Sequence, residues 1–127
     1  MSDNVYIIGV GMIKFGKNFE KSMKAMTGES LQLALDDCGL TKDDIQAAWF
    51  SNSGWGMSEF QHSIRGQVAL AANGLDKVSI INVENACASG SWPLAPKRCT
   101  SSPAVKARAR KIWTVSFPGQ TWKKPDS

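Results

Sequence analysis

The chain has 127 residues, of which 43% are hydrophobic and 20% are charged. This length is enough for one small domain with its own core. No apolar run is long enough to cross a bilayer, and no basic segment followed by an apolar one stands near residue 1. We therefore expect neither a membrane span nor a secretory signal peptide.

The formal net charge of +4 is unevenly distributed along the chain. Seven Lys or Arg and ten Asp or Glu precede residue 92, whereas eight Lys or Arg and a single acid follow. All five prolines and three of the five tryptophans also lie after residue 91. A change this sharp predicts a boundary. We expect an N-terminal portion at residues 1–91 and an unrelated basic tail at residues 92–127, either disordered or frame-shifted.

The three cysteines, Cys38, Cys87 and Cys99, form an odd and widely spaced set. No pair has the spacing of metal ligands, and the set does not suit a disulfide framework. We therefore expect no metal site and an intracellular, reducing compartment. The cytoplasm is the first choice, with the peroxisome and the mitochondrion as alternatives.

In chain order, β-branched residues predict a first strand at residues 5–10. The glycines around it lack the third glycine of a dinucleotide-binding loop, which disfavours that function. Apolar residues at three- and four-residue steps from Met23 to Cys38 predict an amphipathic helix capped by Gly39. Gly28 weakens this helix by about 1 kcal/mol, so we place its start near that residue. Cys38 on its apolar face is expected to be structural.

Thr41 and Asp44 predict a capping box at a short helical turn. Residues 47–50 should form a second strand and residues 51–56 a loop. Residues 64–73 predict a helix stopped by Gly74, with these side chains inward: Ile64, Val68, Leu70 and Ala71. Residues 78–83 predict a third, buried strand. This β-α-β-α-β order indicates an α/β fold with a largely parallel sheet.

Cys87 stands where the third strand should turn into a helix. Its neighbours from Ala86 to Ser91 are small, which lets backbone or a substrate come close. A thiol in the first turn of a helix meets free N–H groups that favour the thiolate, the form that attacks acyl carbon atoms. A lone cysteine is more often buried and inert, so the surrounding sequence decides.

That sequence, NVENACASGS at residues 82–91, resembles the nucleophile motif of the thiolase superfamily, most closely its sterol-carrier-type thiolases and acetyl-CoA acetyltransferases. QHSIRGQVAL at residues 61–70 is similar to the helix before the nucleophile strand in that family. VYIIGVGMIKFGK at residues 5–17 is similar to its opening strand and loop, with Ile13-Lys14 where the family usually has Thr-Pro. The resemblance covers about residues 5–91 and stops at Trp92.

The resemblance implies an acyl-CoA acyltransferase that performs Claisen condensation or thiolysis through a Cys acyl-enzyme, with Cys87 as the catalytic residue. It also implies coenzyme A thioesters as substrates, no permanently bound cofactor, and a homo-oligomer, dimer or tetramer, for the full-length family. The family's catalytic His and second base belong to a C-terminal half with no counterpart here. We therefore expect a partial thiolase-type half with an irregular basic tail, which is inactive alone.

Four other residues near the motifs attract functional interpretations. His62, the single histidine, and Arg65 favour structural, interface or loop-anchoring roles over catalysis or binding of a CoA phosphate. Glu84 and Asn85 flank the nucleophile, where their side chains could brace the turn. The cofactor-binding residues stay unassigned.

The tail leaves alternatives open. Pro93 and Pro96 would cut short the family's nucleophile helix, because proline inside a helix costs about 3 kcal/mol or more. The basic residues and Trp113 would suit a nucleic-acid arm, but a solvated, disordered segment is favoured. Back-translation of residues 92–99 with a shifted frame permits a small, apolar, helix-compatible sequence. For the chain as a whole, the alternatives are a non-catalytic fragment, a small basic binding protein or a ketoacyl-synthase-like condensing enzyme.

Overall fold

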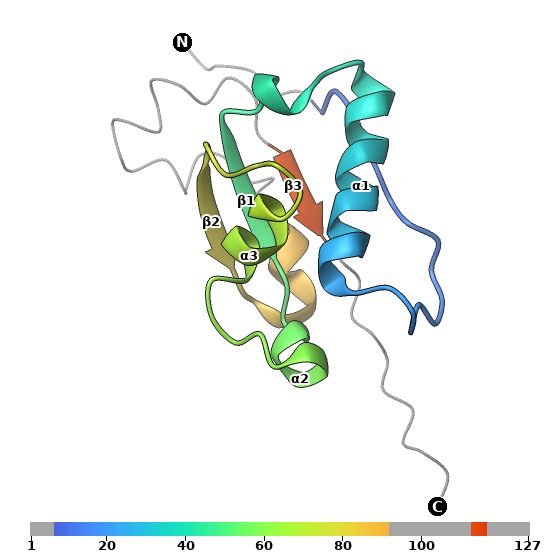
Figure 1. Cartoon of the computed structure of the whole chain (residues 1–127), viewed down its shortest axis with the longest axis vertical. Coiled ribbons are helices and arrows are strands. Elements are labelled where there is room, and N and C mark those ends of the chain that lie inside the picture. Colours follow the sequence, from blue (N-terminus) through green and yellow to red (C-terminus); the bar gives the residue numbers. More distant parts are fainter. Residues whose placement is uncertain (1–6, 92–112, 117–127) are drawn as a thin grey trace, which may run out of the picture.

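The computed structural model describes residues 7–91 and 113–116, of which residue 91 and the last four are described by backbone alone. Three α-helices, two 3-10 turns and one small sheet make up this part (Figure 1). The elements in chain order are α1 (Met23–Cys38), the 3-10 turn η1 (Lys42–Asp44), β1 (Ala47–Ser51), α2 (Trp55–Glu59), α3 (Arg65–Ala71), β2 (Ser79–Val83), the 3-10 turn η2 (Ala86–Ser91) and β3 (Trp113–Ser116). The α/β class is therefore confirmed.

The sheet has the order β2-β1-β3, and both neighbours run parallel to β1. Ala47 pairs with Ser79 at one end of β1–β2, and Ser51 pairs with Val83 at the other. The expected strands at residues 47–50 and 78–83 and their parallel arrangement are confirmed. The prediction that the second of these strands is buried is wrong, because β2 is an edge strand whose residues are exposed or only partly buried. Because parallel strands point their carboxyl ends to one edge, the segments after β1 and β2 meet there.

Two strand predictions differ from the structure. Residues 7–10 form no strand, and Ile7 and Val10 are 73% and 69% exposed. The edge of β1 away from β2 is instead occupied by β3, from the segment expected to be an irregular tail. Residues 5 and 6 and the rest of the tail lie outside the described residues, so the boundary at residue 92 stays a prediction.

Helix α1 begins earlier than expected, at Met23, where the Ser22 Oγ accepts the Ala25 N–H at 3.2 Å. Gly28 lies inside it and makes room for a neighbour, since a Cβ there would come 2.1 Å from Asn73 Oδ1. The predicted Gly39 cap is confirmed, with a left-handed φ of 66°. So is the capping box, in which the Thr41 N–H donates to Asp44 at 3.0 Å.

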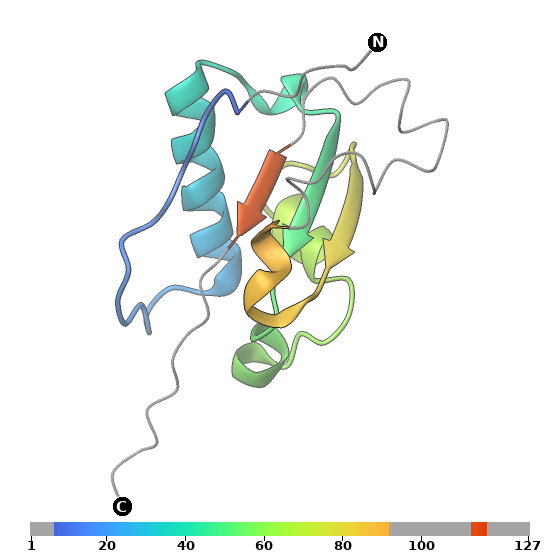
Figure 2. The ribbon, with the colours of Figure 1, turned by 180° about the vertical axis from the view of Figure 1, so that it is seen from behind.

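The core lies between the sheet and the two helices α1 and α3. It is built from residues that are at most 5% exposed: Met23, Met26, Leu31, Leu35, Ile45, Ala48, Phe50, Trp55, Ala69, Leu70 and Leu75. Cys38 packs against this core, as expected of a structural cysteine. Side chains alternate across a strand, so Trp49 faces the other side of the sheet from Phe50 and is also buried. In Figure 2, η2 lies over that side of β1.

The second predicted helix is shorter and turned differently from the expectation. Helix α2 (Trp55–Glu59) begins inside the loop expected at residues 51–56, and α3 begins only at Arg65. Leu70 is buried as expected, but Ile64 is 61% exposed and Ala71 is exposed too. The inward face instead contains Gly66 and Ala69. Ile64 precedes the helix with a positive φ of 42°, so it does not continue the helical stripe.

Gly66 is expected to tolerate no side chain, because α3 packs directly on the sheet there. A Cβ at this position would come 2.6 Å from Phe50 Cβ and 2.8 Å from Ile80 Cγ2. Gly66→Ala should therefore lower the free energy of unfolding by about 1–3 kcal/mol, the usual cost of overpacking. Urea denaturation would measure it. Gly54→Ala is the matched control, since its Cβ would meet nothing within 4 Å. Equal stability of the two variants would contradict this packing.

Candidate functional site

Cys87 lies in the turn that follows β2, at the carboxyl edge of the sheet. The residue before it, Ala86, has a left-handed φ of 45°, which is uncommon for a residue with a side chain. The Glu84 carboxylate accepts the Ala86 N–H at 2.7 Å and so holds this conformation. The expected bracing of the turn by the Glu84 side chain therefore agrees with the geometry. Cys87 itself is exposed and forms no disulfide.

Ser89 closes the same turn from inside. It is only 3% exposed, and its hydroxyl accepts the Asn85 N–H at 2.6 Å and donates to the Ala86 carbonyl at 2.8 Å. The Ala88 N–H also donates to the Asn85 carbonyl at 3.0 Å. Asn85 thus contributes to the turn through its backbone. Together these bonds fix the backbone on both sides of Cys87 and leave the thiol at the surface.

The helix expected to begin at Cys87 is a 3-10 turn in the structure, η2, as far as residue 91. A 3-10 turn is tighter than an α-helix and has poorer hydrogen-bond geometry. Pro93 and Pro96 lie outside the described residues, so their expected effect on this helix stays a prediction. The small residues beside Cys87 fit the tight turn, because they place no bulky side chain around the thiol.

Replacing Ser89 by alanine is expected to loosen the turn. The change leaves the part-buried Asn85 N–H without its acceptor, which should cost about 1 kcal/mol and speed amide exchange at Asn85 and Ala86. Hydrogen exchange followed by NMR would measure both amides. Ser79→Ala, at an exposed position in β2, is the control. Unchanged exchange at residues 85 and 86 would show that Ser89 does not hold the turn.

A hollow of about 300 Å³ lies beside this turn, at the carboxyl ends of β1 and β2. Its lining is mostly polar or aromatic and comes from the ends of β1 and β2, the start of α3 and the loops beside them: Phe50, Asn52, His62, Ile64, Arg65, Asn82, Val83 and Glu84. Glu84 joins the two features, since it lines the hollow and braces Ala86. One residue of the wall, Glu84, is therefore close to Cys87 in the sequence, although the Cys87 thiol is not part of the wall.

Arg65 and His62 both stand in the wall of this hollow. The Arg65 guanidinium donates to the Gln61 carbonyl at 3.1 Å and also to the Asn52 carbonyl. These bonds agree with the expected loop-anchoring role, although its partners are carbonyls and not the carboxylate of an ion pair. The exposed His62 packs against α2, where a Cβ on Gly56 would come 2.5 Å from its Nδ1. Neither arrangement places a base at Cys87.

Two residues of the site were not singled out from the sequence. Asn82 Oδ1 accepts the Gly66 N–H at 2.6 Å, and its Nδ2 donates to Gln67 at 2.7 Å, so it ties the start of α3 to β2. Ser89 closes the Cys87 turn. A serine four residues after an asparagine in a small-residue turn is a usable signal for such a side-chain bond to the backbone. Asn82 carries no comparable local signal, because its partners are distant in the chain.

Among the described residues, no cluster of three or more His, Cys, Asp or Glu side chains is arranged to hold a metal ion. In the same part of the chain, no helix is both long and apolar enough to cross a membrane.

A comparison with protein-family models finds no match. Curated proteins do match. The chain is 42% identical over 90 residues to non-specific lipid-transfer protein-like 2 of Caenorhabditis elegans, which covers 68% of this chain and 20% of that protein. It is 35% identical over 91 residues to an acetyl-CoA acetyltransferase of Methanocaldococcus jannaschii, covering 72% and 23%. It is 33% identical over 104 residues to sterol carrier protein 2 of Gallus gallus, covering 77% and 17%.

Several solved structures share the fold, two synthases among them. The 3-oxoacyl-[acyl-carrier-protein] synthase III from Aquifex aeolicus aligns with a TM-score of 0.53 and 10% identity, over 75% of this chain and 29% of that one. The priming β-ketosynthase of the R1128 polyketide pathway aligns with a TM-score of 0.50 and 22% identity, over 59% and 22%. The chain spans about a fifth of the length of the curated relatives above. Over that length it is a relative of the thiolase superfamily, on the side of the sterol-carrier-type and acetyl-CoA acetyltransferase proteins.

Proposed function

We propose that this chain carries the acyl-accepting part of a thiolase-type acyltransferase and that Cys87 is its nucleophile. The observation that carries the proposal is the turn at residues 84–89, which exposes one thiol on a backbone fixed by Glu84 and Ser89. Proteins position a nucleophile by surrounding it with residues whose own geometry is fixed by hydrogen bonds and packing. The identity to acetyl-CoA acetyltransferase supplies the reaction class.

In the proposed step, the Cys87 thiolate attacks the carbonyl carbon of an acyl-CoA. A new carbon–sulfur bond forms to Cys87, the bond from that carbon to the sulfur of coenzyme A breaks, and coenzyme A leaves as a thiolate that takes up a proton. The small side chains of Ala86 and Ala88 leave room for the thioester beside Cys87. The substrates are coenzyme A thioesters, no permanent cofactor is needed, and a homo-oligomer is the expected assembly of the longer protein.

The 127-residue chain alone is proposed to have no thiolase turnover. The Cys87 thiol has to lose its proton, and the carboxylate of Glu84 in the same turn already accepts the Ala86 N–H. General acid–base groups contribute ~10²–10⁴-fold each to such reactions. The ketosynthase alternative is less favoured, because the synthase structures are at most 22% identical and show only the fold.

The test is a joined protein in which residues 1–91 of this chain precede the remainder of the Methanocaldococcus jannaschii acetyl-CoA acetyltransferase. We expect this protein to cleave acetoacetyl-CoA with coenzyme A. The loss of the absorbance of acetoacetyl-CoA would measure this reaction. We expect the 127-residue chain, freed of host thiolase, to stay at the rate of a control without enzyme. Turnover by the 127-residue chain above that control would contradict the proposal that it needs further catalytic groups.

A further inference from the structure

The segment at residues 7–12 contains strand-forming residues that the structure leaves out of the sheet. Ile7, Val10 and Met12 are 73%, 69% and 65% exposed. Val10 donates its N–H to the carboxylate of Asp37 at 2.8 Å. Exposed apolar residues of strand-forming types can pair with a strand edge. The segment therefore has the composition of a strand without a partner strand.

The topology gives this segment one natural place. The order of segment 7–12, α1 and β1 along the chain is the same strand–helix–strand order as that of β1, α3 and β2. Parallel strands that are joined through a helix have right-handed crossovers. Helices α1 and α3 pack together, since the Asn73 amide between them donates to the carbonyls of Lys24 and Ala69. Two right-handed crossovers with both helices on one face place their strands in sequence across the sheet. Segment 7–12 would then lie beside β1, on the side away from β2.

That place is occupied by β3. The four residues of β3 pair in parallel with β1, from Ala48–Trp113 to Ser51–Ser116. Figure 1 shows β3 between β1 and α1, at the edge of the sheet. A strand of four residues at an edge has few hydrogen bonds to lose. The same edge of β1 is thus occupied by β3 and is also the place where the topology would put segment 7–12.

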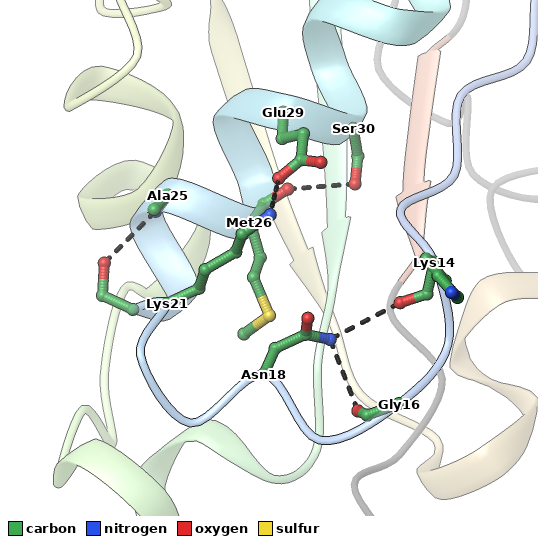
Figure 3. A network of polar contacts seen from close by, with 9 residues as sticks. Lys14, Gly16, Asn18, Lys21, Ala25, Met26, Glu29 and Ser30 are labelled. Carbon is green, nitrogen blue, oxygen red and sulfur yellow. Dashed lines mark hydrogen bonds and ion pairs between the residues drawn. The ribbon is translucent and has the colours of Figure 1, made fainter.

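Segment 7–12 itself lies close against α1, since a Cβ on Gly9 would come 2.7 Å from the Ala34 carbonyl oxygen and one on Gly11 would lie even closer to the Ser30 carbonyl oxygen. Figure 3 shows the loop that follows it, where the Asn18 amide donates to the carbonyls of Lys14 and Gly16 at 3.5 and 3.3 Å. The loop is joined to α1 by the ion pair of Lys21 and Glu29, whose side chains are 40% and 42% exposed. Exposed pairs of this kind contribute little to stability. The loop at residues 14–21 therefore restrains the segment only weakly, and its main support is the packing of Gly9 and Gly11 on α1.

We propose that segment 7–12 and β3 are alternative partners for the same edge of β1, so that the sheet exchanges one strand for the other. Pairing of segment 7–12 would bury part of its exposed apolar surface and release β3. Because β3 also lies against η2, the exchange would change what neighbours the turn that contains Cys87. This inference concerns the sheet alone and stands whether or not Cys87 is a nucleophile.

The experiment uses two proline variants of the full chain, Thr114→Pro and Val115→Pro. Successive N–H groups of a strand point to opposite sides, so one proline removes a bond to β1 and the other faces away at the edge. We expect the proline that removes a bond to β1 to slow amide exchange in residues 7–12 by roughly ten-fold or more. We expect the proline whose position faces away from β1 to leave that exchange unchanged. Folded variants with unchanged exchange in residues 7–12 would overturn the proposal.

A second measurement needs no variant to fold. A peptide of residues 5–12 with a lysine tag is added to the unaltered chain, and a scrambled peptide serves as the control. We expect the first peptide alone to accelerate amide exchange in residues 113–116 with saturation, because it displaces β3. No acceleration would overturn the proposal. The proposal would also be overturned if the protection of residues 7–12 from amide exchange in the proline variant depended on protein concentration. Such a dependence would mean that the segment pairs with another copy of the chain.

Discussion

Replacing Cys87 by serine in the joined protein is expected to lower thiolysis of acetoacetyl-CoA by on the order of 10⁴–10⁶-fold, the range seen when an enzyme loses its nucleophile. A serine hydroxyl keeps the size of the side chain but is far less ionised than a thiol at neutral pH. The turn around it should be unchanged, because its bonds come from Glu84 and Ser89 and not from the thiol. Steady-state kinetics would measure the loss.

Cys38→Ser is the matched control for this substitution. Cys38 lies at the end of α1, packs against the core and donates weakly to the Leu35 carbonyl at 3.4 Å. Its replacement should leave the rate of the joined protein within a few-fold, although stability could fall by roughly 1 kcal/mol. Comparable losses in the two variants would mean that cysteine replacement acts through folding, and the assignment of Cys87 would fail.

Replacing Leu31 by alanine is expected to destabilise the N-terminal portion severely. Leu31 is 2% exposed at the centre of α1's inward face. Leucine-to-alanine changes in cores cost about 2–5 kcal/mol, and whole domains have a net stability of only ~5–15 kcal/mol. The portion also leaves apolar side chains such as Phe19 and Phe60 exposed at 86% and 84%, so its reserve should be small. Urea denaturation would measure the loss.

Leu33→Ala, on the same helix, provides the comparison. Leu33 is 42% exposed, so the change removes little buried surface and alanine favours the helix slightly. We expect a change within about 0.5 kcal/mol. If both leucine variants unfolded at the same urea concentration as the unaltered chain, α1 would not be packed on the sheet as the structure has it.

Elements with a strong local signal could be predicted from the sequence. Gly39 in a left-handed cap and the pair Thr41 and Asp44 mark the ends of elements through bonds within a few residues. The β-branched run before Cys87 likewise predicts β2. Glu84 could be predicted as a brace because it flanks Cys87 in the sequence, and the structure shows that its carboxylate accepts the Ala86 N–H.

Features that depend on distant segments could not be predicted in this way. The residues of β3 are strand formers, Trp, Thr and Val among them, yet their pairing with β1 requires the whole sheet. Segment 7–12 has an equally good strand pattern and is left out. Gly28 appeared to weaken α1, whereas it makes room for Asn73 from the turn after α3. Arg65 binds two carbonyls that only the folded loops bring together.

The most direct test of the account is to locate the acyl group. The joined protein is mixed with acetyl-CoA, quenched with acid, digested and mapped by mass spectrometry. The account predicts one acetyl group on the peptide that contains Cys87, removed by added coenzyme A and absent from Cys87→Ser. An active joined protein that carries its acetyl group on another residue, or that is acetylated equally after Cys87→Ser, would contradict the assignment of Cys87 as the nucleophile.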